Sequence, residues 1–233
     1  MSDTEIAFHC FESAEQVATE AARRMLAAAN QAIGARGRFQ LVLAGGRTPL
    51  AAYTLLVDQS ADWDRWHIFF GDERCVPEKD PDRNSSAAAS AFLDRVPIPA
   101  ANRYPIPAEL GAEEAAARYE SLIRPRLPFD LVVLGLGEDG HTASLFPGQA
   151  IPLGSLVMPV HQAPKPPPDR VSLTPRALVA SAAILILVTG GGKREALRAW
   201  REGADSPVAR VVSTAPVEVL MDRAAAGVAT AWA

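Results

Sequence analysis

The stretch FDLVVLGLGEDGHTASLFPG, residues 129–148, decides the fold of this chain. It opens with an unbroken apolar run, Leu131 to Leu134, and continues as a loop in which three glycines precede His141. A short apolar run that is rich in β-branched residues and stops at glycine predicts a buried strand followed by a tight loop. Because open α/β sheets bind ligands at such strand ends, His141 lies where chemistry is expected.

Strand and helix patterns alternate on both sides of this stretch. Residues 6–10 predict a first strand, and Ser13 with Gln16 forms a capping-box pattern that opens a long helix ending near Gly34 and Gly37. Further strands are expected over residues 39–44, 67–70, 156–160, 171–173, 183–188 and 217–221, with helices between them. The alternation predicts one Rossmann-like α/β domain, residues 1–233, whose mostly parallel sheet is flanked by helices.

The composition of the chain argues against several classes of protein, among them nucleic-acid-binding, disulfide-rich, secreted and membrane-spanning proteins. The chain has 233 residues and a net charge of -4, and no basic block could track nucleic acid, so a nucleic-acid partner is not expected. Two cysteines give neither a disulfide framework nor zinc-ligand spacing. The acidic N-terminus lacks a signal-peptide pattern, and the longest apolar run, residues 177–188, is shorter than the roughly 20 residues of a membrane span. We expect a cytoplasmic protein without membrane contact. The sequence does not decide the oligomeric state, although a monomer is slightly favoured.

Glycine or acidic clusters follow four of the expected strands. They are Gly45-Gly46, Gly71-Asp72-Glu73-Arg74, residues 135–141 and residues 190–193. Since the carboxyl ends of parallel strands lie at one edge of a sheet, the four clusters can converge on one crevice.

The predicted crevice contains groups that attract an anion. Thr48 and Pro49 suit the start of a helix directly after Gly45-Gly46, which presents free backbone N–H groups and a positive dipole end. Lys193 and Arg170 add positive charge. A phosphorylated small molecule is therefore the expected ligand.

Two better-known phosphate motifs fit less well. Residues 135–140 have the glycine spacing of a dinucleotide fingerprint, but His141 follows in place of a clear helix. Residues 190–193 lack the upstream glycine and the Ser or Thr of a nucleotide-triphosphate loop.

His141 is the candidate general base, with Asp139 as a nearby carboxylate, because imidazole gains and loses a proton near neutral pH. The alternative is that His141 only caps a helix that starts near Thr142. The other three histidines, in or beside expected strands, favour structural or solvent-facing roles.

These motifs resemble those of 6-phosphogluconolactonases of the bacterial type. The resemblance rests on residues 45–49, 70–77, 134–148 and 165–174, and it covers nearly the whole chain. Arg47 stands where that family often has Ser. The resemblance implies the isomerase/lactonase-like form of the fold.

The resemblance also implies a reaction, the hydrolysis of 6-phosphoglucono-δ-lactone in the pentose phosphate pathway. It makes His141 the base that activates water and Asp139 the residue that orients it, with loop amides of residues 137–140 or Arg74 as donors to the oxyanion. No metal or organic cofactor is expected. The implied substrate-binding residues are Gly45, Gly46, Arg47, Thr48, Asp72, Arg74, Arg170 and Lys193.

Two other functions stay open on the sequence. Amino-sugar-phosphate isomerase-deaminases are similar, but they carry an Asn-Glu-Pro segment where this chain has residues 144–147, SLFP. A non-catalytic sugar-phosphate sensor is the third reading; no DNA-binding segment precedes the first expected strand.

Overall fold

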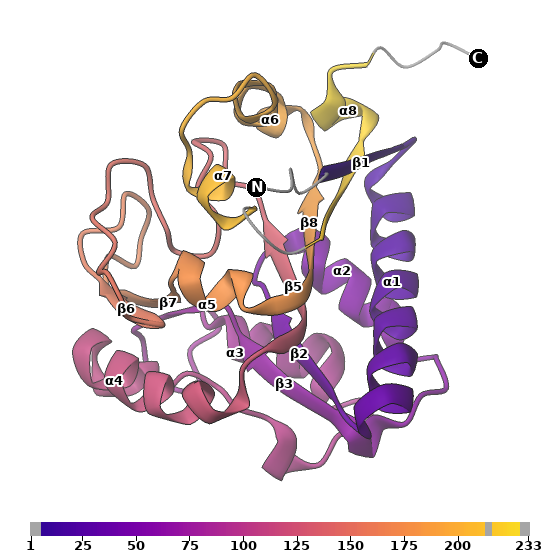
Figure 1. Ribbon diagram of the computed structural model, residues 1–233, viewed down its shortest axis with the longest axis vertical. Helices are drawn as coiled ribbons and strands as arrows, with labels where there is room; N and C mark the ends of the chain where they lie inside the picture. The colour runs from indigo at the N-terminus through magenta and orange to yellow at the C-terminus, as the bar shows by residue number, and fades with distance from the viewer. Residues whose placement is uncertain (1–5, 213–215, 229–233) are drawn as a thin grey trace.

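Six parallel strands form the main sheet of the computed structural model, which describes residues 6–212 and 216–228 (Figure 1). The strand order is β1-β9-β8-β5-β2-β3, and every neighbouring pair is parallel. The strands are β1 (Ile6–Phe11), β2 (Phe39–Leu43), β3 (Trp66–Phe70), β5 (Phe129–Gly135), β8 (Ser181–Val188) and β9 (Val217–Asp222). The predicted mostly parallel sheet is confirmed.

The central strands are apolar because both faces of the sheet are covered. Every residue of β2 is buried, as are six of the seven in β5. Leu41 pairs with Leu131, and Val42 pairs with Val132. Figure 1 shows α1 (Ala14–Arg36) along one side of the sheet and α5 (Pro175–Val179) on the other.

Helix α1 starts and ends largely as its sequence predicts. The Ser13 side chain accepts a hydrogen bond from the Gln16 N–H, and the Gln16 side chain accepts one from the Glu12 N–H. Gly37, with φ of 73°, ends the helix in the left-handed conformation that favours glycine. Gly34 does not end it and lies inside the last turns.

The remaining helices are short, apart from α2 and α4. They are α2 (Arg47–Leu56), α3 (Asn84–Ala88), α4 (Ala112–Ile123), α6 (Arg194–Arg201), α7 (Pro207–Val211) and α8 (Arg223–Ala226). Residues 89–93 continue α3 as a single π-helical stretch, and 3-10 turns occur at residues 63–65, 100–102, 108–110, 124–126 and 191–193.

A second, antiparallel sheet corrects the expectation of one sheet. It has three strands in the order β4-β7-β6, namely β4 (Asp72–Arg74), β6 (Val157–Val160) and β7 (Arg170–Leu173). The segment after β3, expected as a loop, is therefore a strand that pairs with β7. Helix α4 packs against this sheet.

The strand order creates a switch point beside β2. The chain continues from β2 to β3 on one side, and β5 then lies on the other side of β2. Open α/β sheets form their ligand crevice at such a reversal. The turns after β2 and β5 are two of the four clusters that the sequence singles out.

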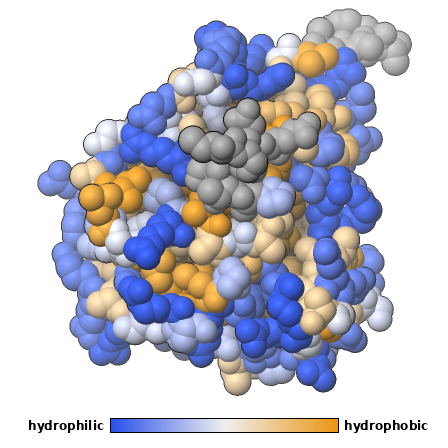
Figure 2. Space-filling view, in the orientation of Figure 1, coloured by the Kyte–Doolittle hydropathy of each residue, from blue (hydrophilic) through white to orange (hydrophobic). Residues whose placement is uncertain are grey.

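The surface carries no large apolar face in the view of Figure 2, where hydrophilic residues surround small, separate apolar patches. The exposed large apolar side chains, Leu55, Leu110, Leu153 and Val228, belong to different segments. Among residues 6–212 and 216–228, no helix combines the length and the apolar character that crossing a membrane requires.

Candidate active site

A cleft of about 760 Å³ opens at the carboxyl edge of the main sheet. It is lined by the turns that follow β2, β5 and β8, together with residues of β4 and β7. Of the ten residues predicted for the site, all but Asp139 line it: Gly45, Gly46, Arg47, Thr48, Asp72, Arg74, His141, Arg170 and Lys193. The convergence of the strand ends is thus as expected.

The turn between β2 and α2 has the geometry of an anion site. Gly46 has φ of 102°, which brings the chain directly into the first turn of α2. The N–H groups of Gly46, Arg47 and Thr48 have no acceptor among the described residues. Free amides at the positive end of a ten-residue helix attract an anion.

His141 and Asp139 are held together on the loop after β5. Nδ1 of His141 lies 2.5 Å from Oδ1 of Asp139, which also accepts the His141 backbone N–H at 3.2 Å. Partial burial works to raise the pKa of the Asp139 carboxyl, but the contacts with His141 outweigh burial and lower that pKa. A carboxylate acceptor at Nδ1 places the proton of the neutral ring there and leaves Nε2 with a free lone pair.

The tight turn that carries His141 depends on glycine. The Gly137 N–H donates to the His141 carbonyl at 2.7 Å, and the Gly140 N–H donates to the Gly137 carbonyl at 3.1 Å. A Cβ atom at Gly137 would overlap the His141 ring. These two amides are therefore committed within the turn, which removes them from the expected oxyanion donors.

No helix starts near Thr142. Thr142 and Leu145 form an isolated bridge, and Ala143 between them has φ of 48°. The alternative in which His141 only caps a helix is therefore wrong.

Asp72 lies at the floor of the cleft with both carboxylate oxygens engaged. Oδ2 accepts the Ser144 hydroxyl at 2.6 Å, and Oδ1 accepts the Asn84 amide at 3.1 Å. Asn84 in turn packs against Gly45, where a Cβ atom would overlap its side chain. Asp72 is thereby linked, through Asn84, to the turn between β2 and α2.

Arg170 lines the cleft, but most of the hydrogen bonds of its guanidinium go to backbone carbonyls of its own loop. It donates to the carbonyls of Lys165, Pro166 and Pro167 at 2.8–3.3 Å and stacks 5.6 Å from the Phe146 ring. The side chain is 6% exposed, and burial lowers the pKa of its guanidinium. Arg170 therefore holds the Lys165 loop in place. The sequence predicted only that Arg170 binds the substrate, not this structural role.

Lys193 ends the 3-10 turn before α6 and faces the cleft. Burial lowers the pKa of its ammonium; Glu138 nearby acts against this effect, and Lys165 adds to it. Asp222 fixes the start of this turn, because its carboxylate accepts the Gly190 N–H at 3.0 and 3.1 Å.

The two anion-attracting turns touch each other. The Thr48 hydroxyl, on α2, lies 2.6 Å from the Thr189 hydroxyl, which follows β8, and either can donate. This contact closes one side of the cleft.

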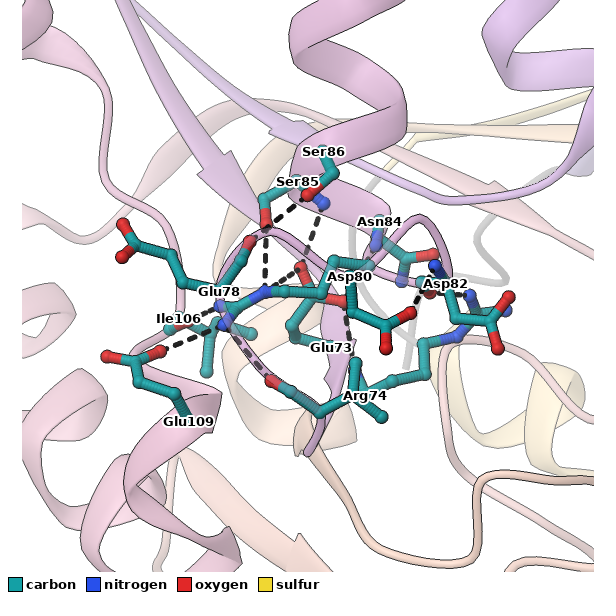
Figure 3. Close-up of polar contacts among 12 residues, drawn as sticks. Glu73, Arg74, Glu78, Asp80, Asp82, Asn84, Ser85, Ser86, Ile106 and Glu109 are labelled. Carbon is teal, nitrogen blue, oxygen red and sulfur yellow. Dashed lines mark hydrogen bonds and ion pairs between the residues drawn. The ribbon is translucent and has the colours of Figure 1, made fainter.

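Glu73, labelled in Figure 3 beside the cleft residues Arg74 and Asn84, forms a buried ion pair with Arg83. The Glu73 carboxylate accepts the N–H groups of Arg74, Asn84 and Ser85 at 2.7–2.9 Å. Arg83, which is 2% exposed, donates to Glu109 at 2.9 Å and to the Ile106 carbonyl. The pair sets where β4 ends and where α3 begins, while Arg74 also donates to the Asp82 carbonyl.

The residues without a predicted role in the site include Lys165, Asn84 and Asp222, which line the cleft, and Ser144, which contacts Asp72. Lys165 belongs to the quoted Lys-Pro-Pro segment, and Ser144 follows His141 closely, so both lie within motifs already singled out. Asn84 and Asp222 follow no glycine cluster and carry no such signal.

A parallel sheet of this order, with a ligand-sized cleft at its switch point, defines an α/β protein with a small-molecule site. The family model described as glucosamine-6-phosphate isomerases/6-phosphogluconolactonase matches residues 12–221. The chain belongs to this family.

Named relatives confirm the resemblance seen in the motifs. The 6-phosphogluconolactonase of Mycobacterium tuberculosis is 36% identical over 93% of this chain and 95% of its own. The structure of 6-phosphogluconolactonase from Thermotoga maritima superposes with a TM-score of 0.85 at 30% identity, covering 94% of this chain and 99% of that one. A monomeric glucosamine-6-phosphate deaminase, at 21% identity and a TM-score of 0.83, covers 96% and 100% and shares the fold.

Proposed function

We propose that this protein hydrolyses 6-phosphoglucono-δ-lactone to 6-phosphogluconate. The names of its relatives support this activity, and the cleft supplies the parts that the reaction needs. The observation that carries the proposal is the 2.5 Å contact between Asp139 and Nδ1 of His141, which leaves Nε2 of a cleft residue able to accept a proton.

His141 is the proposed general base. As water attacks the lactone carbonyl carbon, its proton passes to Nε2 and the carbonyl oxygen becomes an oxyanion. The tetrahedral intermediate then collapses: the carbonyl re-forms, the bond to the ring oxygen breaks, and the imidazolium returns its proton to that oxygen. Asp139 keeps the ring oriented throughout and stabilises the imidazolium.

The phosphate of the substrate is proposed to bind at the free amides of Gly46, Arg47 and Thr48, with Lys193 opposite them. Both parts line the cleft, and a dianionic phosphate gains from a helix N-terminus and a nearby ammonium. The Arg47 side chain adds positive charge at the same helix end.

The test is a time-resolved assay on freshly generated lactone, with the spontaneous hydrolysis rate subtracted. The unaltered protein should accelerate hydrolysis, and His141→Asn should lower kcat by a factor of about 100 or more. Its thermal midpoint should stay near that of the unaltered protein, since His141 is held by one loop. Near-normal turnover by a well-folded His141→Asn variant would remove the histidine from this role.

An amino-sugar-phosphate isomerase-deaminase is the second candidate, because the family and one structural neighbour include that activity in their names. Residues 144–147 argue against it, because they read SLFP where the isomerase-deaminases carry an Asn-Glu-Pro segment, so the glutamate of that segment is missing here. Ammonia release from glucosamine 6-phosphate at enzyme-like rates would favour this candidate over the lactonase.

A further inference from the structure

Glu138 lies at the rim of the cleft between two lysines. Its Oε2 is 3.9 Å from Nζ of Lys165, and its Oε1 would lie 3.3 Å from a Cβ atom at Gly192, the residue before Lys193. The two lysines come from different loops, the one before β7 and the one after β8. The Glu138 carboxylate therefore reaches across the opening between them.

Nothing in the described part of the chain gives Glu138 a structural task. Its side chain is 62% exposed, and the long ion pair with Lys165 is the one polar contact found for it there. The neighbouring acids of the cleft differ, because Asp72 and Asp222 are buried and their oxygens accept several hydrogen bonds. Glu138 can thus leave its position at little cost to the fold.

Lys165 is itself well placed to bind an anion. Arg170 fixes the backbone of its loop by donating to the Lys165 carbonyl at 2.8 Å, while the Lys165 ammonium is half-exposed and its residue lines the cleft. An ammonium on an anchored loop is available to a ligand without reorganisation of the backbone.

We propose that Glu138 is a built-in competitor for the substrate phosphate: its carboxylate takes the place between Lys165 and Lys193 when the cleft is empty and gives way when the phosphate binds. This inference rests on the proposed function, which puts the phosphate beside Lys193. The exchange of one anion for another keeps a negative charge close to both lysines in either state. It lowers the affinity for substrate and product alike, which favours release of the product.

The test compares Glu138→Gln with the unaltered protein in binding inorganic phosphate and 6-phosphogluconate. Removing the competing charge should lower both dissociation constants by about threefold to tenfold, the range expected for losing one exposed ion pair together with a negative charge near Lys193. The gain should shrink as salt is raised, because exposed ion pairs are screened. Glu114→Gln on the outer face of α4, where Glu114 pairs with Arg118, makes the same charge change away from the cleft and should leave binding unchanged.

A second background shows whether the lysines carry the effect. In a Lys165→Ala protein the gain from Glu138→Gln should be clearly smaller, since the ion-pair partner of Glu138 is gone. Equal affinities of Glu138→Gln and the unaltered protein, or an undiminished gain without Lys165, would overturn the inference. Either result would contradict the role of Glu138 without affecting the proposed lactone hydrolysis. If the unaltered protein bound phosphate normally but did not hydrolyse the lactone, that result would contradict the proposed function and not the role of Glu138.

Discussion

At the scale of single residues, two glycines of the cleft are defined by what lies against them. Gly137 has the His141 ring where a Cβ atom would be, and Gly45 has the Asn84 side chain there. The sequence marks both as turn glycines, but the turn alone does not require them: neither has a positive φ. Each position requires glycine because a neighbouring side chain occupies the space of a Cβ atom. This requirement can be seen only in the folded structure.

Gly137→Ala should therefore damage catalysis more than stability. The added methyl group forces the imidazole away from its contact with Asp139, and a displacement near 1 Å costs about 100-fold in kcat. Gly34→Ala is the matched control, since a Cβ atom there meets nothing within 4 Å in the last turns of α1. Steady-state kinetics alongside urea unfolding would measure both; a normal kcat for Gly137→Ala contradicts the packing argument.

Lys193 predicts how ligand binding depends on pH. Because burial lowers the pKa of its ammonium below 10.5, the charge is lost at a lower pH than in an ordinary lysine. Only the protonated form attracts the phosphate, so affinity is constant below that pKa and falls up to tenfold per pH unit above it.

Calorimetric titration of 6-phosphogluconate between about pH 7 and pH 10 would measure this loss of affinity. Lys193→Arg should abolish the loss over that range, since guanidinium remains charged. An unchanged loss in Lys193→Arg would assign the titration to another group.

Much of the site is predictable at this scale because the motifs place charged and glycine residues directly after strands. The exceptions have physical reasons. Arg170, predicted as a ligand from its charge, also donates to three loop carbonyls from a buried position, and its charge alone does not predict that structural role. Asn84 and Asp222 act through contacts with backbone far away in the chain, which no local pattern reveals.

At the scale of elements, α3 shows how a distant side chain sets a helix boundary. Helix α3 starts at Asn84, directly after Arg83, and the side chain of Arg83 makes no capping hydrogen bond. The Glu73 carboxylate accepts the N–H groups of Asn84 and Ser85, which replaces a local cap. Long periodic segments such as α1 are predicted well, since their own residues determine them.

Glu73→Gln should lower the free energy of unfolding by about 3 kcal/mol, because it leaves the buried Arg83 guanidinium without its closest buried carboxylate. The matched change is Glu109→Gln, at the more exposed partner of Arg83, and its cost should be smaller. Urea unfolding followed by circular dichroism measures both. If both variants lost the same free energy of unfolding, the buried position of Glu73 would not make its ion pair more important for stability than that of Glu109.

At the scale of the whole molecule, the second sheet is the part that sequence reasoning missed. β4 has three residues, all charged, and shows none of the alternation that predicts a strand. The other two strands of this sheet, β6 and β7, were expected as strands, but their apolar residues do not show which sheet they join. Pairing partners far apart in the chain decide that, as the register of β4 with β7 shows.

The cleft draws on segments from both sheets, so a bound ligand should stabilise the whole fold. At about 100 times its dissociation constant, 6-phosphogluconate should raise the free energy of unfolding by about 2.7 kcal/mol, or the thermal midpoint by about 5–10 °C. Gluconate, which lacks the phosphate, should shift it far less at the same concentration. Equal shifts from the two compounds would argue against a phosphate subsite.

Because the hydroxyls of Thr48 and Thr189 contact each other, the cleft can lose either one of them and still present a hydroxyl donor. When one hydroxyl donates to the other, the second keeps its own proton for an anion in the cleft, so the pair offers one donor in either of two orientations. Replacing either threonine alone with valine still leaves that one donor. Redundancy of this kind hides the contribution of both residues from single substitutions, and it becomes visible only when both are changed together.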